Sequence, residues 1–244
     1  MGTLVAKKPR RRRSPNVEIS HSEVVHVPPE AHTLDGFLEW VFSGQAPEKR
    51  HVTFIDGQVY VDMSEEAIDT HASVKTGIYQ GLLPIMAEDD FGKFFTDGVL
   101  YVNKEANVSC NPDGIAASWG AFESGRVEFV VRTGKRRALE GSADWLMEIV
   151  SDSSVPKDTK VLKAKYHRAE VGEYWLIDAR GKDISFQIFH WSKADFVAAP
   201  NKDGWVPSKL FGREFRLTRE QDRLGSWTYK LEGRQDRHGI RAKQ

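Results

Sequence analysis

The stretch "ADWLMEIVSDSSVPKDTKVLKAKY", residues 143–166, changes from an apolar to a charged segment within a few positions. Its apolar part contains one carboxylate, Glu148. An unpaired charge in a protein core is costly, so an acid in such a run usually has a partner or a chemical role. The charged part is typical of a helix that opens at Ser154, Val155 or Pro156 and runs to about Ala169. We therefore expect a buried strand followed by a helix.

A second apolar strand is predicted directly after this helix, at "EYWLIDA", residues 173–179. Two apolar strands on either side of a helix are typical of neighbours in the centre of a sheet. Further upstream, "VTFIDGQVYVDM", residues 52–63, indicates a hairpin that turns at Asp56 and Gly57. Together these elements predict an α/β (α+β) fold with a mixed central sheet flanked by helices.

The segments between the hairpin and the first apolar strand complete this pattern. Periodic apolar residues from about 66 to about 88 predict a helix, which Pro84 should kink or interrupt. The stretches "KFFTDGVLYVN", residues 93–103, and "NVSCNPDGIAAS", residues 107–118, are each interpreted as one strand. "TGKRR", residues 133–137, is interpreted as a basic turn.

Composition bounds the class of protein. The chain has 244 residues, of which 40% are hydrophobic, and this is enough for a sizeable core. No run approaches the roughly 18 apolar residues that a membrane helix needs, so no membrane partner is expected. The single cysteine, Cys110, permits no internal disulfide, and a reducing compartment, the cytoplasm, is the expected location.

Charge is balanced overall, with 35 basic and 35 acidic residues, but it is unevenly distributed. Residues 1–16 contain six basic residues, all within "KKPRRRR", and no acids. We expect a basic disordered arm at 1–16, one folded domain at 17–232 and a polar tail at 233–244. The arm could contact nucleic acid or act as a localisation signal, whereas a solvated tail is the simpler interpretation.

Two acids are candidates for a metal site. In "NPDG", Asp113 lies near the end or a bend of a strand, because Pro112 cannot donate a hydrogen bond to a neighbouring strand. Glu148 lies on the strand predicted next to it. Two carboxylates from adjacent strands offer the hard oxygen ligands that Mg²⁺ prefers, and such a site can activate water against a phosphodiester. The alternative is an ordinary turn aspartate and a glutamate paired with a lysine.

Several motifs in order carry a resemblance to a known family. The segments "PDG", "EIVSDSSVPKDT" and "LKAKYHRAEVGEYWLIDARG", preceded by "IDGQVYVDMSEEAIDTHASVK", resemble the Uma family of restriction endonucleases, a branch of the PD-(D/E)XK nuclease superfamily. The resemblance covers about residues 52–190. It implies a restriction-endonuclease-like core and cleavage of DNA with Mg²⁺, or with Mn²⁺. It also implies that Asp113 and Glu148 are the motif acids and that the backbone carbonyl of Ile149 is a further metal ligand.

The motif lysine is missing from this chain. Two residues after Glu148, where the superfamily has lysine, stands Val150. The resemblance to the Uma family also implies a lysine on the following helix, four residues after an aspartate. In this chain Leu162 stands four residues after Asp158. Three lysines nearby are candidate replacements: Lys157, Lys160 and Lys163. Lys157 is favoured and Lys163 is second, while a solvated lysine is the alternative for each.

The predicted helix from about residue 66 offers two further candidates. In related nucleases an acid of this helix often reaches the metal, so the resemblance makes Glu66 a candidate catalytic residue. A glutamate in the first turn of a helix is also simply favourable for the helix dipole. His71 is interpreted either as a phosphate contact or base, or as a polar residue without such a role.

Three classes of function follow from these readings. The first is a metal-dependent endonuclease acting on DNA, and the second is a nucleic-acid-binding protein that retains the fold without catalysis. The third is an interaction protein in which the acids merely pair with lysines. A homodimer is one possible assembly, which the sequence does not determine.

Overall fold

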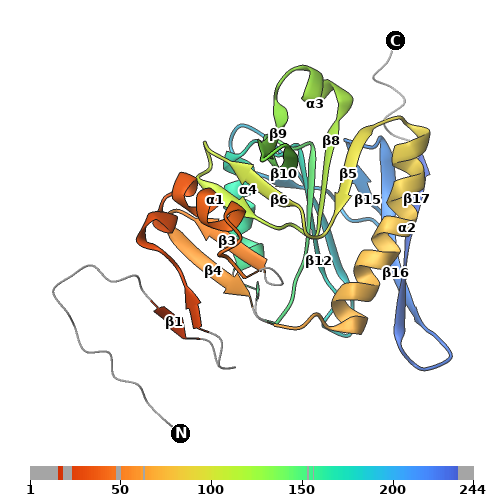
Figure 1. Cartoon of the computed structure of the whole chain (residues 1–244). Helices are drawn as coiled ribbons and strands as arrows, with labels where there is room; N and C mark the ends of the chain where they lie inside the picture. The colour runs from red at the N-terminus through yellow and green to blue at the C-terminus, as the bar shows by residue number, and fades with distance from the viewer. Residues whose placement is uncertain are drawn as a thin grey trace, which may run out of the picture. The chain divides into compact units, whose positions relative to one another are not determined.

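The computed structural model describes residues 16–18, 24–47, 51–62, 64–152, 154–155 and 157–235 (Figure 1). The chain divides into two compact units, Met1–Met63 and Ser64–Gln244, which are described separately. Apart from Asn16, the expected basic arm lies outside the described residues, as do residues 236–244 of the expected tail. No helix within the described ranges is long and apolar enough to cross a membrane.

The first unit consists of a helix and short strands. Its described elements are β1 (Asn16–Glu18), β2 (Val24–His26), η1 (Pro29–His32), α1 (Leu34–Phe42), β3 (His51–Ile55) and β4 (Gln58–Asp62). The hydroxyl of Thr33 accepts a hydrogen bond from the Gly36 amide and thereby caps α1. Phe37 of α1 packs on Phe54 of β3, with ring centroids 5.5 Å apart.

The hairpin predicted at residues 52–63 is confirmed. β3 and β4 pair antiparallel, and the two residues between them both have positive φ, 49° at Asp56 and 84° at Gly57. This backbone conformation matches the twist of the flanking strands, and an Asp-Gly pair adopts it at low cost.

A six-stranded mixed sheet forms the centre of the second unit. Its strands, in spatial order, are β14 (Val197–Ala198), β13 (Ser185–His190), β12 (Glu173–Asp178), β11 (Trp145–Ile149), β8 (Gly114–Ser118) and β5 (Gly92–Thr96). β11 and β12 are parallel neighbours, whereas the other pairs are antiparallel. The prediction that the two apolar strands lie side by side is therefore confirmed, as is a mixed α+β fold.

Further paired strands and a short helix complete the second unit. β7 (Val108–Cys110), β6 (Leu100–Asn103), β10 (Lys135–Gly141) and β9 (Val127–Arg132) pair in that order, with β6 and β10 parallel. β15 (Val206–Ser208), β16 (Arg213–Gln221) and β17 (Trp227–Gln235) form an antiparallel sheet. The short helix α3 (Trp119–Glu123) follows β8.

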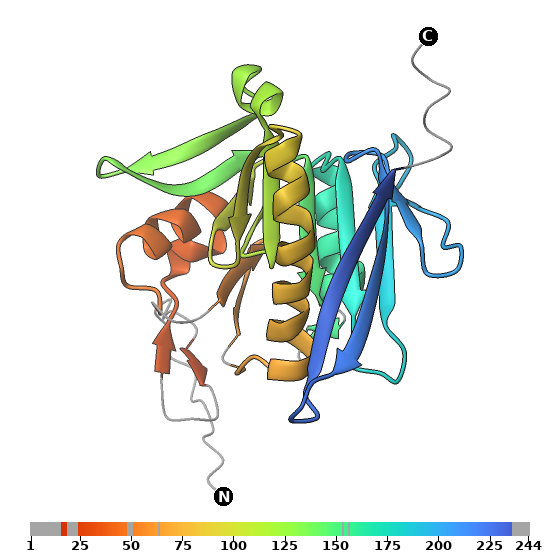
Figure 2. The same cartoon turned by 90° about the vertical axis from the view of Figure 1, so that its right-hand side faces the viewer.

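Helix α2 (Ser73–Glu88) begins with a π-helical turn, η2 (Ile68–Ala72), and lies beside the β16–β17 hairpin (Figure 2). Its buried stripe, Val74, Ile78, Leu82 and Met86, enters the same core as Trp145 and Trp175. α2 can approach β17 closely because Gly77 has no side chain. A Cβ at this position would lie only 2.4 Å from the Tyr229 carbonyl oxygen. Pro84 lies inside α2, which continues to Glu88, so the predicted interruption does not occur.

The second predicted helix is also observed, again with a π-helical start. η3 (Lys157–Leu162) leads into α4 (Lys163–Arg168), and Leu162 and Tyr166 are buried. Single π-helical turns inside helices are often found at functional sites. Here one such turn carries His71 and the other carries Lys157 and Asp158.

Three details of the strand prediction are wrong. "KFFTDGVLYVN" forms two strands, β5 and β6, because the chain turns at Gly98, whose φ is 90°. "NVSCNPDGIAAS" also forms two, β7 and β8, separated by residues 111–113, which include Pro112. The basic turn is shorter than expected, because only Thr133 and Gly134 form it and β10 begins at Lys135.

Candidate active site

Asp113 lies in the bend between β7 and β8, directly before β8 begins. In the antiparallel pairing of β8 with β11, Gly114 is opposite Met147, so the next residues outward are Asp113 and Glu148. Asp113 Oδ2 accepts a hydrogen bond from the Ile149 amide, with an N–O distance of 2.7 Å. The structure therefore brings together the two acids and the main chain of Ile149, at the ends of adjacent strands.

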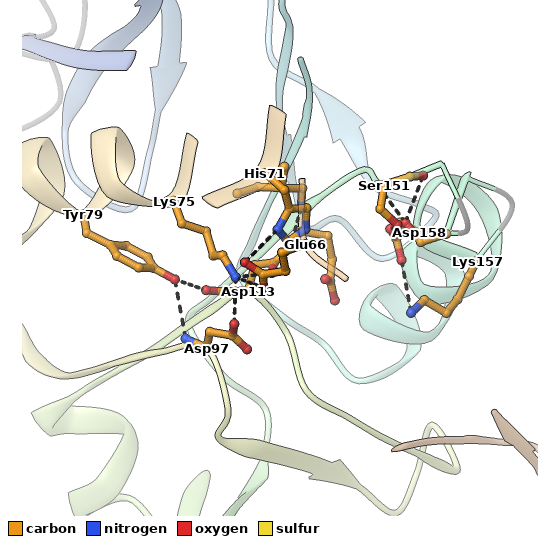
Figure 3. A network of polar contacts seen from close by, with 12 residues as sticks. Glu66, His71, Lys75, Tyr79, Asp97, Asp113, Ser151, Lys157 and Asp158 are labelled. Atoms are coloured by element: carbon orange, nitrogen blue, oxygen red, sulfur yellow. Dashed lines mark hydrogen bonds and ion pairs between the residues drawn. The ribbon is translucent and has the colours of Figure 1, made fainter. Parts of the chain in front are cut away.

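A stripe of helix residues reaches Asp113 from the opposite side (Figure 3). His71 Nε2 lies 3.3 Å from Asp113 Oδ2, and Lys75 Nζ lies 3.6 Å from Asp113 Oδ1. The Tyr79 hydroxyl donates a hydrogen bond to the main-chain oxygen of Asp113. Residues four apart lie on one face of a helix, so η2 and α2 present all three groups to this one aspartate.

Lys75 is the centre of an ion-pair network. Its ammonium donates hydrogen bonds to Glu66 Oε1 and, at 2.7 Å, to Asp97 Oδ2. Burial lowers the pKa of Lys75, but the charge of Asp113 and the hydrogen bonds to Asp97 and Glu66 outweigh it, and the net pKa is raised. Lys75 therefore carries a positive charge at neutral pH although its side chain is only 9% exposed.

His71 bridges the two acids Glu66 and Asp113. Its Nδ1 lies 3.7 Å from Glu66 Oε2, on the side opposite the Nε2 contact with Asp113. Burial lowers the pKa of His71. The hydrogen bond to Asp113 and the negative charge of Asp113 together raise it by more, so the net pKa of His71 is above the ordinary value.

Glu148 is buried next to a tyrosine hydroxyl. The Tyr166 hydroxyl donates to Glu148 Oε1 and also lies 3.2 Å from Cys110 Sγ. Burial raises the pKa of Glu148 well above its ordinary value, the charges of Asp158 and Asp113 raise it further, and Lys157 lowers it. Glu148 is thus close enough to Asp113 and to Asp158 for their charges to affect its pKa.

Asp158 belongs to the same environment. It is 2% exposed, and the Ser154 hydroxyl donates to its Oδ2. Lys157 Nζ lies 3.9 Å from Asp158 Oδ1. Burial raises the pKa of Asp158 to about 6, although Lys157 and Ser154 act in the opposite direction. The structure thus places Lys157 beside Asp158, as Figure 3 shows.

The structure places the second-ranked candidate lysine, Lys163, elsewhere. Lys163 Nζ lies 3.8 Å from the centroid of the Phe189 ring, in a cation–π contact. Val150 and Leu162, the two positions where related proteins carry the motif lysine, are each 1% exposed and belong to the core.

A divalent metal ion fits the donor set. Glu66, His71 and Asp113 each offer one ligand atom, and these atoms all lie within 4.8 Å of one another. Among the described residues, His71 Nδ1 and Asp158 Oδ1 are buried polar atoms without a hydrogen bond, which makes them available to a further ligand. Carboxylate oxygens with one imidazole suit Mg²⁺ or Mn²⁺.

Sequence reasoning missed four residues of this network: Lys75, Tyr79, Asp97 and Tyr166. The first two had a signal, because they follow His71 at a spacing of four beside the apolar stripe of the predicted helix. Tyr166 stands among the apolar positions of its helix, a pattern that predicts core packing and not a hydrogen bond to Glu148. Asp97 had no signal, since it lies in a turn that the sequence pattern assigned to a strand.

Comparisons with known proteins agree with this geometry. A mixed sheet that presents acids at the ends of adjacent strands, faced by a helix that carries further polar groups, matches the restriction-endonuclease-like class. The chain belongs to the Uma2 family, described as "Putative restriction endonuclease", whose family model matches residues 34–220.

A solved structure shows the same fold. It is a protein from Anabaena variabilis described as "a putative nuclease belonging to DUF820". The TM-score is 0.54 at 16% sequence identity, over 73% of this chain and 90% of that chain. Among curated proteins, none matches this chain.

Proposed function

We propose that this chain is a metal-dependent endonuclease that hydrolyses DNA phosphodiester bonds. The observation that carries the proposal is the cluster of Glu66, His71 and Asp113, whose ligand atoms lie within 4.8 Å of one another, with Glu148 on the strand adjacent to Asp113. Family membership supports the same reading. Mg²⁺ is the proposed ion, with Mn²⁺ as a substitute.

The residues proposed to hold the ion are Asp113, Glu148 and the carbonyl of Ile149, with Glu66 and His71 next to them. When bound, such an ion neutralises phosphate charge and lowers the pKa of a bound water. The chain's own contribution is to fix its ligands in advance. The Ile149 amide holds the carboxylate of Asp113, Tyr79 holds its main chain, and Tyr166 orients Glu148.

The first prediction tests this proposal with supercoiled and short duplex DNA in Mg²⁺, in Mn²⁺ and in a chelator. Asp113→Asn and Glu148→Gln should each lower the cleavage rate by about 100-fold or more, because a neutral amide is a weaker ligand for a divalent cation. The measurement is the rate of product formation on a gel. Manganese binding, followed by electron paramagnetic resonance, should weaken in the same variants.

Glu105→Gln is the matched control, since Glu105 is an exposed acid outside the network. It should cleave DNA and bind manganese as the wild type does. Equal activity in all four proteins, or activity that survives the chelator, would contradict the proposal.

One observation favours the second candidate function, DNA binding without catalysis. Both positions for the motif lysine are apolar and buried, so the chain lacks the usual cation of this chemistry there. If DNA binds in the presence of chelator while no metal supports cleavage, the binding function is the correct one.

A further inference from the structure

We propose that Lys75 of α2 supplies the catalytic cation that this nuclease fold otherwise takes from position 150 or 162. The inference rests on the proposed function. It adds to the proposed active site a side chain, Lys75, that lies outside the sequence motif. Lysine reaches the acids from the facing helix instead of from the strand that carries Glu148.

In this chain the usual positions carry buried apolar side chains. The Val150 amide donates to the Ile177 carbonyl oxygen at 2.8 Å, which continues the pairing of β11 with β12, and its side chain is 1% exposed. Leu162 is equally buried on the inner side of η3. Neither side chain carries a charge, so a cation at this site would come from another position.

Lys75 brings an ammonium to Asp113, one of the two motif acids, by another route. Its Nζ lies 3.6 Å from Asp113 Oδ1, and Glu66 and Asp97 hold it from two further sides. By comparison, Lys157 Nζ lies 3.9 Å from Asp158 Oδ1, and its charge also acts on Glu148. Lys165, on α4, donates instead to the Ala106 carbonyl oxygen.

Helix packing fixes where the Lys75 ammonium lies. On α2, Gly77 and Gly81 contact the backbone of β17, where a Cβ would lie 2.4 Å and 2.6 Å from carbonyl oxygens. One turn after Lys75, the Tyr79 hydroxyl bonds to the main chain of Asp113. These contacts hold the helix on both sides, so a group on this stripe is preorganised toward Asp113.

The chemistry assigned to Lys75 is electrostatic. Water adds to phosphorus and the ester bond to the leaving oxygen breaks, while the attacking water loses a proton to solvent and the leaving oxygen takes one from solvent. Lys75 exchanges no proton in this sequence. It contacts a nonbridging phosphate oxygen and stabilises the negative charge that develops there.

A purely structural role is the alternative, in which Lys75 only neutralises Glu66, Asp97 and Asp113. The two roles differ in what a neutral side chain of similar size does. If Lys75 is catalytic, Lys75→Met should lower kcat at saturating DNA and metal by about 100-fold or more and change KM little. Manganese affinity, measured without DNA by electron paramagnetic resonance, should be unchanged or tighter, because a competing cation has been removed. Lys75→Arg should restore part of kcat.

Lys75→Met leaves acids without their partner and could fail to fold, so the double variant Lys75→Met with Asp97→Asn is measured beside it. Asp97→Asn alone is its control. The double variant removes one acid together with the cation, and its thermal unfolding and far-UV circular dichroism report whether it is folded. Lys157→Met, made in parallel, should lower kcat far less than Lys75→Met does if Lys75 is the cation.

The outcomes separate the inference from the proposed function. Cleavage by wild type and by folded Lys75→Met or double variant at similar rates overturns the inference alone. Loss of cleavage in Lys157→Met together with retention in Lys75→Met assigns the role to Lys157 and also overturns it. Absence of cleavage by the wild type in every metal overturns the proposed function, and the inference with it.

Discussion

At the scale of single residues, Tyr166 shows how a buried hydroxyl connects core and site. It lies between the Cys110 thiol and the Glu148 carboxylate, and it is fully buried among Tyr101 and Tyr174. A buried carboxylate is tolerated only where hydrogen bonds replace water. Glu148 at the end of an apolar strand therefore has the partner that the opening sequence stretch requires.

Tyr166→Phe tests this role. It removes the hydroxyl and leaves Glu148 Oε1 without its donor, which should lower the free energy of unfolding by about 1–3 kcal/mol. Because Glu148 loses its orientation, DNA cleavage should fall as well. Urea denaturation and the cleavage rate measure the two effects.

Tyr101→Phe is the matched control for Tyr166→Phe. Tyr101 is also fully buried, and its hydroxyl donates to the Gly141 carbonyl oxygen at 2.7 Å, not to a site acid. It should lose a similar amount of stability and keep its cleavage rate. Equal cleavage in both variants would show that Tyr166 is only part of the core.

At the scale of elements, the site is assembled where strand ends meet helix starts. β8 and β11 end at the acids, and the π-helical turns η2 and η3 bring His71 and Asp158 to them. Arg180 links two of the loops involved, since its guanidinium binds Asp178 at the end of β12 and, at 3.0 Å, Asp152 after β11. This link should stabilise the segment from which η3 begins.

The Arg180 link predicts a pH dependence of stability. Its hydrogen bond holds the pKa of Asp178 below the ordinary value, so the folded state binds the proton less well than the unfolded state does. The link therefore stabilises the fold fully above the ordinary pKa of 3.8, and this contribution is lost as pH falls through the lower, folded value. Arg180→Ala should lower the free energy of unfolding at pH about 7 by less than about 1 kcal/mol, and the difference from wild type should shrink toward pH about 3.

Urea denaturation at a series of pH values measures this difference. In an Asp178→Asn background, the effect of Arg180→Ala should no longer change across the acid range. A difference that grows on acidification would contradict the assignment.

At the scale of the whole molecule, charge is separated along the chain. Six of the 35 basic residues lie in residues 1–16, and the rest of the chain carries 29 basic and 35 acidic residues, a net charge of −6. A DNA substrate must approach a body with excess negative charge. We therefore propose that the N-terminal segment, which lies outside the described residues apart from Asn16, contributes to DNA binding through phosphate contacts.

Deletion of residues 1–15 should weaken DNA binding and flatten its dependence on salt. Each phosphate contact contributes about 0.9 to the slope of log affinity against log salt, so six contacts would lower the slope by up to about 5. Fluorescence anisotropy with labelled duplex DNA in chelator measures it between low and moderate salt. A variant of full length with the six basic residues replaced by glutamine controls for chain length, and an unchanged slope in both would contradict the proposal.

The sequence by itself determined the elements with strong local signals. The Asp56-Gly57 hairpin, the helix predicted from about residue 66 to about residue 88 and the two apolar strands are local patterns of turn chemistry and periodicity. Each is present in the structure. The pair Asp113 and Glu148 was also within reach, because strand order places their ends side by side. The strand boundaries were harder to predict. The turns at Asp97 and at residues 111–113 are short, and apolar residues stand on both sides of each turn.

Only the tertiary structure decided which groups complete the site. Lys75 and Tyr79 contact Asp113, and Asp97 binds Lys75, because α2 packs on β17 through glycines and so approaches the start of β8. These contacts join segments that are far apart in the sequence. Sequence spacing predicts which residues share a helix face but not what that face meets. The lysine expected on or after the Glu148 strand was therefore sought at Lys157 and Lys163, whereas packing brings a third lysine, from a different helix, to the acids.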